Sequence, residues 1–229
     1  MASAANVAVG PAKYFAVDVE CVATGTDHNS RSVAQVAVVD EHMNVLLNVY
    51  VKQEVPVASY MTPLTGLTEE VLRTRGVSLQ EALAAVRTAL PRHAVLIGQN
   101  IRQDVQWLGL KEGTDFEGMM DLQGLFRVWN DKFRSWSVFA QSHLARVLLD
   151  WRDAEGPSEH DAVEDARKSM ALFNHHRHVL QTDPRAMQAA QQALLAAPVE
   201  PSFARRNAVF EGVCMGNRKT CVCGAPFFG

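Results

Sequence analysis

The chain has 229 residues, of which 48% are hydrophobic, as in globular proteins and unlike chains that remain disordered. Its 22 basic and 25 acidic residues give a net charge of −3, so a nucleic-acid partner would have to be held by local basic patches or through metal ions. No apolar run is long enough to span a bilayer and there are only four cysteines, so we expect no membrane partner and no disulfide scaffold, in an intracellular protein of the nucleus or cytoplasm.

The first strong pattern lies in residues 15–25, after a loose lead-in of small residues over 1–12. Its apolar positions predict a buried strand that is interrupted by two acids, Asp18 and Glu20. Because side chains alternate along a strand, both carboxylates are expected to project from the same face. Such a pair is repulsive unless a cation lies between the two groups, and oxygen ligands favour Mg²⁺ or Mn²⁺. The alternative is a strand edge at which both acids face water.

Two β-rich runs follow, over 33–39 and 45–51, with a hairpin-like spacing. We expect them to form an antiparallel meander with the first strand. Thr68, followed by two glutamates, is typical of a helix N-cap. A second helix is expected to begin at Ser78 and to end at Pro91, because apolar residues recur between them at helical spacing.

Strands and helices alternate in the next part of the chain. The expected order is a strand over 94–98, a helix over 102–110, a short strand within 119–126, an amphipathic helix over 137–149, a break at 155–158 and a long helix over 161–180. This order predicts an α/β fold, in which a mixed β-sheet (antiparallel meander plus parallel strands) is flanked by helices. We divide the chain into the lead-in over 1–12, a main domain over 13–180, and a C-terminal helix with a cysteine-containing tail over 181–229.

Three further polar residues stand at starts of predicted helices. Asp104 falls in the first turn after the strand 94–98, and His160 and Asp165 open the long helix. Taken alone, either acid is explained as a complement to a helix dipole, and His160 as a solvated loop histidine. Ligands of such sheets bind beyond the strand ends, however, so Asp104 is in position to reach Asp18 and Glu20.

The combination of these residues is more specific than any one of them. In chain order it reads Asp-x-Glu on the first strand, Asp after a central strand, and His-x(4)-Asp at the start of a late helix. With this pattern the chain resembles the DEDDh exonucleases, a subgroup of the ribonuclease H-like 3′–5′ exonucleases. It is most similar to the RNA exonuclease 4 and interferon-stimulated 20-kDa exonuclease group, over about residues 13–180. The segments 65–68 and 159–166 also match that group in place and wording.

The resemblance implies a role for each matching residue. The four metal-binding carboxylates, which would hold two ions of Mg²⁺ or Mn²⁺, correspond to Asp18, Glu20, Asp104 and Asp165. His160 corresponds to the general base. Contacts with the substrate are implied for a further group: Cys21, Val22, Leu67 and Asn100.

These roles imply a metal-dependent 3′–5′ exonuclease that hydrolyses the terminal phosphodiester bonds of single-stranded nucleic acid. The family favours RNA over DNA as the partner, and the products would be nucleoside 5′-monophosphates. Two alternatives remain: a DNA-preferring exonuclease, and a catalytically silent nucleic-acid-binding module of the same fold. The complete set of five residues argues against the silent module, because an inactive relative usually lacks one of the carboxylates or the histidine.

The C-terminal tail carries Cys214, Cys221 and Cys223 among turn-forming glycines. Three thiolates near turns can hold zinc, but a fourth ligand is missing from the tail and would have to come from elsewhere. We therefore favour ordinary reduced thiols at these positions. The helix over 183–197 and the tail could also dock a partner or a second copy of the chain, as a homodimer.

Overall fold

The computed structural model describes residues 12–152 and 160–227. The predicted lead-in over 1–12 falls outside the described residues except for its last position, and the predicted break at 155–158 lies wholly outside them. No helix in the described part of the chain combines the length and the apolar character that crossing a membrane requires.

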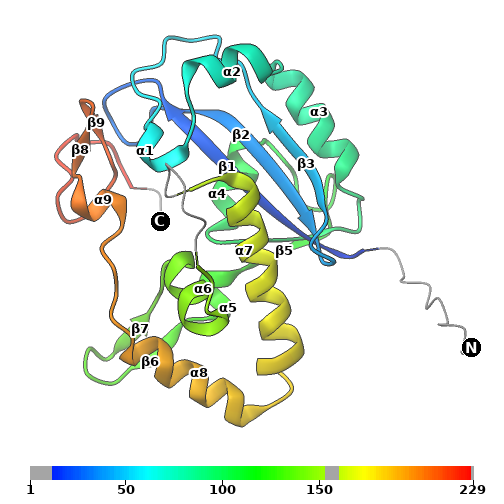
Figure 1. Cartoon of the computed structure of the whole chain (residues 1–229), viewed down its shortest axis with the longest axis vertical. Helices are drawn as coiled ribbons and strands as arrows, with labels where there is room; N and C mark the ends of the chain where they lie inside the picture. The colour runs from blue at the N-terminus through cyan, green and yellow to red at the C-terminus, as the bar shows by residue number, and fades with distance from the viewer. Residues whose placement is uncertain (1–11, 153–159, 228–229) are drawn as a thin grey trace, which may run out of the picture.

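A five-stranded mixed sheet forms the centre of the molecule (Figure 1). Its strands are β1 (Tyr14–Ala23), β2 (Arg31–Asp40), β3 (Val45–Tyr50), β4 (Val95–Gly98) and β5 (Gly118–Asp121), in the spatial order β3-β2-β1-β4-β5. The first three strands pair antiparallel, whereas β4 pairs parallel to β1 and β5 parallel to β4. The predicted meander and the predicted mixed sheet are both confirmed.

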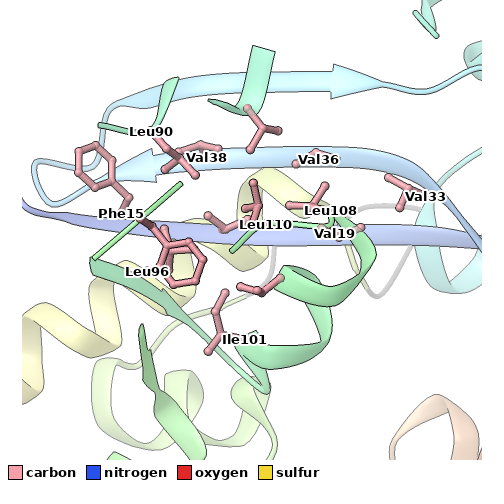
Figure 2. Packing of buried hydrophobic residues seen from close by; sticks show 14 of the residues in the cluster. Phe15, Val19, Val33, Val36, Val38, Leu90, Leu96, Ile101, Leu108 and Leu110 are labelled. Atoms are coloured by element: carbon pink, nitrogen blue, oxygen red, sulfur yellow. The ribbon is translucent and has the colours of Figure 1, made fainter. Parts of the chain in front are cut away.

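Helices cover both faces of this sheet. On one face lie α3 (Leu79–Ala89) and α4 (Ile101–Trp107), which share a core with alternate residues of β1 and β2. Figure 2 shows this core, in which Val36 and Val38 of β2 face Leu90 and Leu108 from the helical side. On the other face lie α6 (Gln141–Leu149) and α7 (Ala162–His175), and Figure 1 shows α7 crossing the sheet.

Side chains cap the helices where the sequence predicts it. The hydroxyl of Thr68 accepts a hydrogen bond from the backbone N–H of Val71, and thereby begins α2 (Glu69–Arg75). Ser78 and Glu81 form a reciprocal capping box at the start of α3. Each of these bonds satisfies a backbone group that the first helical turn leaves without a partner.

One predicted element is confirmed and another ends earlier than expected. The short strand predicted within 119–126 is β5, which ends at Asp121, and the carboxylate of Asp121 accepts a hydrogen bond from the N–H of Gln123 and begins the short helix α5 (Leu122–Leu125). The helix predicted to reach residue 110 ends at Trp107, and Gly109 follows with a positive φ of 57°. The left-handed conformation of this glycine is incompatible with a continuing helix.

A small hairpin replaces the first turn of the helix that was predicted over 137–149. Residue Ser137 belongs to β7 (Ser135–Ser137), which pairs antiparallel with β6 (Val128–Asn130), so α6 begins only at Gln141. These strands are three residues long, too short for their alternation to be recognised in the sequence.

The C-terminal part of the chain packs first against α6 and α7 and then near α1 (Thr62–Thr65). After α7, a π-helical turn η1 (His176–Leu180) leads into α8 (Pro184–Ala196), whose Leu194 is buried in the core that α6 and α7 share. The chain then returns through α9 (Phe203–Arg206) to the hairpin of β8 (Val209–Phe210) and β9 (Val213–Cys214), which lies beside α1 in Figure 1. This return places the cysteine-containing tail next to the end of β1.

Candidate active site

Strand β1 directs its two acids toward the face covered by α7. Ala16 belongs to the core on that face, whereas Val17 and Val19 belong to the opposite core. Asp18 and Glu20 share the parity of Ala16 and therefore project from the α7 face, as the period of two predicts. A register shift follows directly after Glu20, at the Glu20/Cys21 step.

Helix α7 supplies the histidine and the last acid. Asp161 caps the helix by accepting hydrogen bonds from the N–H groups of Val163 and Glu164, and this cap fixes the direction of the first turn. His160 precedes the cap, and its Nδ1 lies 2.6 Å from Oδ2 of Asp165. The side chain of His160 remains 43% exposed, whereas that of Asp165 is 6% exposed.

The strand and the helix bring their ligands to one place. One ligand atom each from Glu20, His160 and Asp165 lie within 4.8 Å of one another, which is compact enough for a shared cation. Asp18 and Asp104 adjoin this group, because the charges of Asp165 and Glu20 raise the pKa of Asp18 and the charge of Glu20 raises the pKa of Asp104. Asp104 is buried in the first turn of α4. The structure thus brings together all five residues of the predicted catalytic set.

Three of the four acids are held in an unfavourable environment. Burial raises the pKa of Asp18 well above its usual value, and the charges of Asp165, Asp104 and Glu20 add to the effect. Burial also raises the pKa of Glu20 to about 8, although His160 opposes the shift. The pKa of Asp104 is raised by burial and then by the charge of Glu20, although hydrogen bonds from the backbone N–H groups of Asp104 and Val19 partly lower it. Without a cation, these groups would retain protons that free carboxylic acids lose.

Asp165 and His160 have the opposite balance. Burial alone would raise the pKa of Asp165, but the hydrogen bond and charge of His160, with the charge of Lys168, lower it. Burial would lower the pKa of His160, but the hydrogen bond and charge of Asp165 outweigh it and raise the pKa. Each partner therefore stabilises the charged form of the other.

Lys168 is a member of the site that the sequence reasoning missed. It is 4% exposed, and its Nζ lies 3.1 Å from Oδ1 of Asp165. The sequence signal was the spacing of three residues within α7, which places the lysine one turn beyond the acid on the same face. A lysine is almost never fully buried unless it is paired, and Asp165 provides such a partner here.

The residues with implied substrate contacts are placed differently from one another. Cys21 lines a cavity of about 310 Å³ beside Glu20, together with Arg31, Met61 and Leu64. Val22 and Leu67 are 0% and 2% exposed, in a small core with Ala34 and Leu72. Asn100 lines a neighbouring cavity with Gln103 and Trp107, and its own N–H donates to the carboxylate of Asp121.

The donor set fits hard divalent cations. Four carboxylates around one histidine offer mostly oxygen ligands, which Mg²⁺ and Mn²⁺ prefer. The pKa values of Asp18, Glu20 and Asp104 are raised first by burial and then by neighbouring acids, and for Glu20 the opposing charges of His160 and Lys168 do not cancel the shift. A bound cation would favour the charged form of each of these acids.

Known proteins match both the sequence and the fold. A family model described as an exonuclease matches residues 15–173. RNA exonuclease 4 of Gibberella zeae is 28% identical over 172 residues, which cover 75% of this chain and 51% of that protein. The human apoptosis-enhancing nuclease is 28% identical over 170 residues, covering 71% and 49%. The chain therefore spans about half the length of these curated relatives.

Solved structures support the fold assignment. The Pan2 catalytic unit of Neurospora crassa superposes with a TM-score of 0.65 at 17% identity, over 85% of this chain and 32% of that one. The Saccharomyces cerevisiae Pan2 module in complex with AAGGAA RNA superposes with a TM-score of 0.62 at 16% identity, over 80% and 32%. At these identities the likeness concerns the fold alone.

The different environments of Asp18 and Asp165 predict opposite effects on stability. Without added Mg²⁺ or Mn²⁺ at pH 8, Asp18→Asn should raise the melting temperature, because it removes a repelled acid. Asp165→Asn should lower the free energy of unfolding by about 1–3 kcal/mol, because it weakens the charged hydrogen bonds that this carboxylate makes with Lys168 and His160. Thermal and urea unfolding measure both effects, and Asp150→Asn, at an 87% exposed side chain, is the neutral control. Equal shifts in Asp18→Asn and Asp165→Asn would contradict the assignment.

The raised pKa of Glu20 also predicts a pH dependence. Between its ordinary pKa of 4.5 and its folded value of about 8, the folded chain binds more protons than the unfolded chain. Without added divalent ions, stability should therefore fall as pH rises through this range. Comparing wild type with Glu20→Gln in thermal melts isolates this contribution from other titrating groups. The wild-type curve should fall more steeply, and parallel curves would refute the shift.

Proposed function

Because the chain belongs to the exonuclease family whose model matches residues 15–173, we propose that it is a metal-dependent 3′–5′ exonuclease. Its substrate would be a single-stranded end, RNA in preference to DNA, and its products nucleoside 5′-monophosphates. The observation that carries the proposal is the convergence of Glu20, His160 and Asp165 within 4.8 Å, beside two further repelled acids. A binding module has no need of this costly arrangement.

The acids and the histidine divide the work. Asp18, Glu20, Asp104 and Asp165 would hold two divalent cations. Such ions, when bound, stabilise the attacking and leaving oxygens of an in-line displacement at a phosphodiester. The proton of the attacking water would pass to His160. The hydrogen bond from Nδ1 of His160 to Asp165 favours the tautomer that leaves Nε2 as the acceptor.

Lys168 and the backbone position these groups. Lys168 and His160 contact different oxygens of the Asp165 carboxylate: Nζ of the lysine contacts Oδ1, and Nδ1 of the histidine contacts Oδ2. The backbone N–H of His160 donates to the carbonyl of Leu64, 2.8 Å away, and this bond connects the histidine to α1, which lines the cavity. The general base is therefore tied on both sides before any substrate binds.

The cavity beside Glu20 is suited to one terminal nucleotide. Its volume of about 310 Å³ lies at the lower end of the range for ligand pockets. Met61 and Leu64 offer an apolar wall for a base, and Arg31 offers a positive charge for a phosphate. The preference for RNA is supported by the names of relatives, among them RNA exonuclease 4, rather than by a contact to a 2′-hydroxyl.

The base assignment is tested by substitution of His160. His160→Ala should reduce kcat by about 10²–10⁴, the usual contribution of a general base, while the four acids remain to bind metal. Single-turnover rates on a short RNA measure the loss, and His42→Ala, at an exposed histidine, is the matched control. Wild-type rates for His160→Ala would remove this residue from the mechanism.

The substrate class is tested with matched polymers. A 5′-labelled single-stranded RNA and its DNA twin are incubated with Mg²⁺ or Mn²⁺, and with EDTA. We expect a ladder that shortens from the 3′ end, faster on RNA, that is abolished by EDTA and restored by excess Mg²⁺. A faster DNA ladder would assign the DNA-preferring alternative. Binding of both polymers without any ladder, by a folded chain, would assign the silent module.

A further inference from the structure

A second group of metal-ligating side chains lies outside the acidic site. Nδ1 of His28 and the Sγ atoms of Cys214, Cys221 and Cys223 all lie within 4.8 Å of one another. His28 belongs to the turn between β1 and β2, whereas the cysteines belong to the C-terminal tail. The turn therefore supplies the fourth ligand that the tail lacks.

The distances within this group are slightly shorter than those of a tetrahedral zinc site. The Sγ of Cys221 lies 3.4 Å from the Sγ of Cys214 and 3.4 Å from that of Cys223. Nδ1 of His28 lies 3.2 Å from the Sγ of Cys223 and 3.6 Å from that of Cys221. With a zinc–sulfur bond of about 2.3 Å, the edges of a sulfur tetrahedron measure about 3.8 Å, so small outward movements would accommodate the ion.

Ordinary thiol chemistry explains the group less well. All three cysteines are free, and their separations of 3.4 Å are far from the length of about 2.0 Å that a disulfide requires. Thiols are weak hydrogen-bond donors, so mutual thiol bonds give little reason for three of them to converge on one imidazole nitrogen. A cation that binds thiolates gives a strong reason.

The local backbone is shaped to close this group. Gly216, with a φ of 71°, allows the tail to pass His28, since a Cβ there would lie 3.3 Å from the Cβ of the histidine. Gly224, with a φ of 78°, turns the chain directly after Cys223. Phe227 stacks on the imidazole ring with centroids 4.2 Å apart.

Independent contacts attach the same tail segment to the same turn. The N–H of Cys214 donates to the carbonyl of Thr26 at 2.8 Å, and Asn29 donates to the carbonyl of Pro226 at 2.9 Å. Arg31 donates to the carbonyl of Cys214 at 2.9 Å. Three thiolates and Zn²⁺ carry a net charge of −1, which this neighbouring guanidinium would balance.

We propose that His28, Cys214, Cys221 and Cys223 form a structural zinc site that fastens the C-terminal tail to the turn between β1 and β2. Thiolate and imidazole ligands select zinc over the Mg²⁺ or Mn²⁺ of an all-oxygen site. Four protein ligands leave no open position, which is the arrangement of structural rather than catalytic zinc. This proposal replaces the prediction of ordinary reduced thiols, because the fold brings His28 to the three cysteines as the fourth ligand that the tail lacks.

The zinc site would complete one wall of the nucleotide cavity. Met215, Gly216 and Phe227 of the tail line the cavity beside Glu20, and His28 lines it from the turn. Loss of the ion would release this wall, although the acidic site on β1, α4 and α7 would remain. The assignment of zinc is independent of the proposed nuclease activity.

Metal content of the full chain is the direct test. The chain is purified without added metal, exchanged into excess Mg²⁺ to displace ions from the acidic site, and measured by plasma mass spectrometry. We expect one zinc per chain. His28→Ala and Cys221→Ser should lose most of it, whereas His42→Ala and Asp18→Asn should keep it. Zinc that is lost in Asp18→Asn and kept in His28→Ala would assign the ion to the acidic site and overturn the proposal.

Thiol protection in the wild-type chain gives a second readout that does not depend on variants that fold. Three thiols should react with a thiol reagent only after a zinc chelator is added, with release of one equivalent of zinc. Cobalt reconstitution should give thiolate-to-cobalt charge-transfer absorption. The proposal would be overturned if the folded wild-type chain is purified without zinc and, after incubation with zinc, its tail thiols react at the same rate with and without the chelator. This outcome would hold whatever the nuclease activity of the chain.

Discussion

Electrostatic repulsion among buried carboxylates is the constraint on which the site depends. Asp18, Glu20 and Asp104 have raised pKa values because burial removes their hydration and, to a smaller extent, because neighbouring acids add negative charge. A fold that gathers these groups loses stability when no cation is present. The arrangement is explained if bound divalent ions offset this loss of stability and also take part in the reaction.

Asp165 shows how the protein manages part of this repulsion by itself. Its two oxygens contact different cationic groups, His160 and Lys168, and its pKa falls although it is buried. Asp165 and Lys168 lie in the first two turns of α7, and His160 directly precedes the N-cap of this helix. The start of one helix therefore provides the acid and both of the groups that lower its pKa. The four acids of the site are therefore not equivalent, and they should respond differently to substitution and to metal.

The turn after β1 connects two kinds of metal chemistry. Asp18 and Glu20, on β1 before the turn, offer hard oxygen ligands, and His28, within the turn, faces the three thiols of the tail. The cavity between them takes lining residues from both groups. The proposed closed thiolate site and the proposed open carboxylate site can coexist, because thiolates and carboxylates prefer different ions.

The sequence by itself determined what depends on local periodicity. Alternation along β1 placed Asp18 and Glu20 on one face, and the caps at Thr68 and Ser78 placed the starts of two helices. The antiparallel meander was predicted from the spacing of the first three strands. The proposed five-residue set was recognised from its pattern along the chain, by resemblance to a known family. The short strands β6 and β7 escaped, because three residues are too few for a period to show.

Only the tertiary structure decided which distant groups meet. His28 reaches Cys223 across 195 residues, and nothing local to either marks the other as a partner. Val22 and Leu67 have the same apolar character as pocket residues, yet the fold packs them in a core with Leu72. The burial of Lys168 likewise depends on the sheet that α7 covers. Partners and burial are set by the path of the whole chain, whereas secondary structure is set mainly by neighbours in sequence.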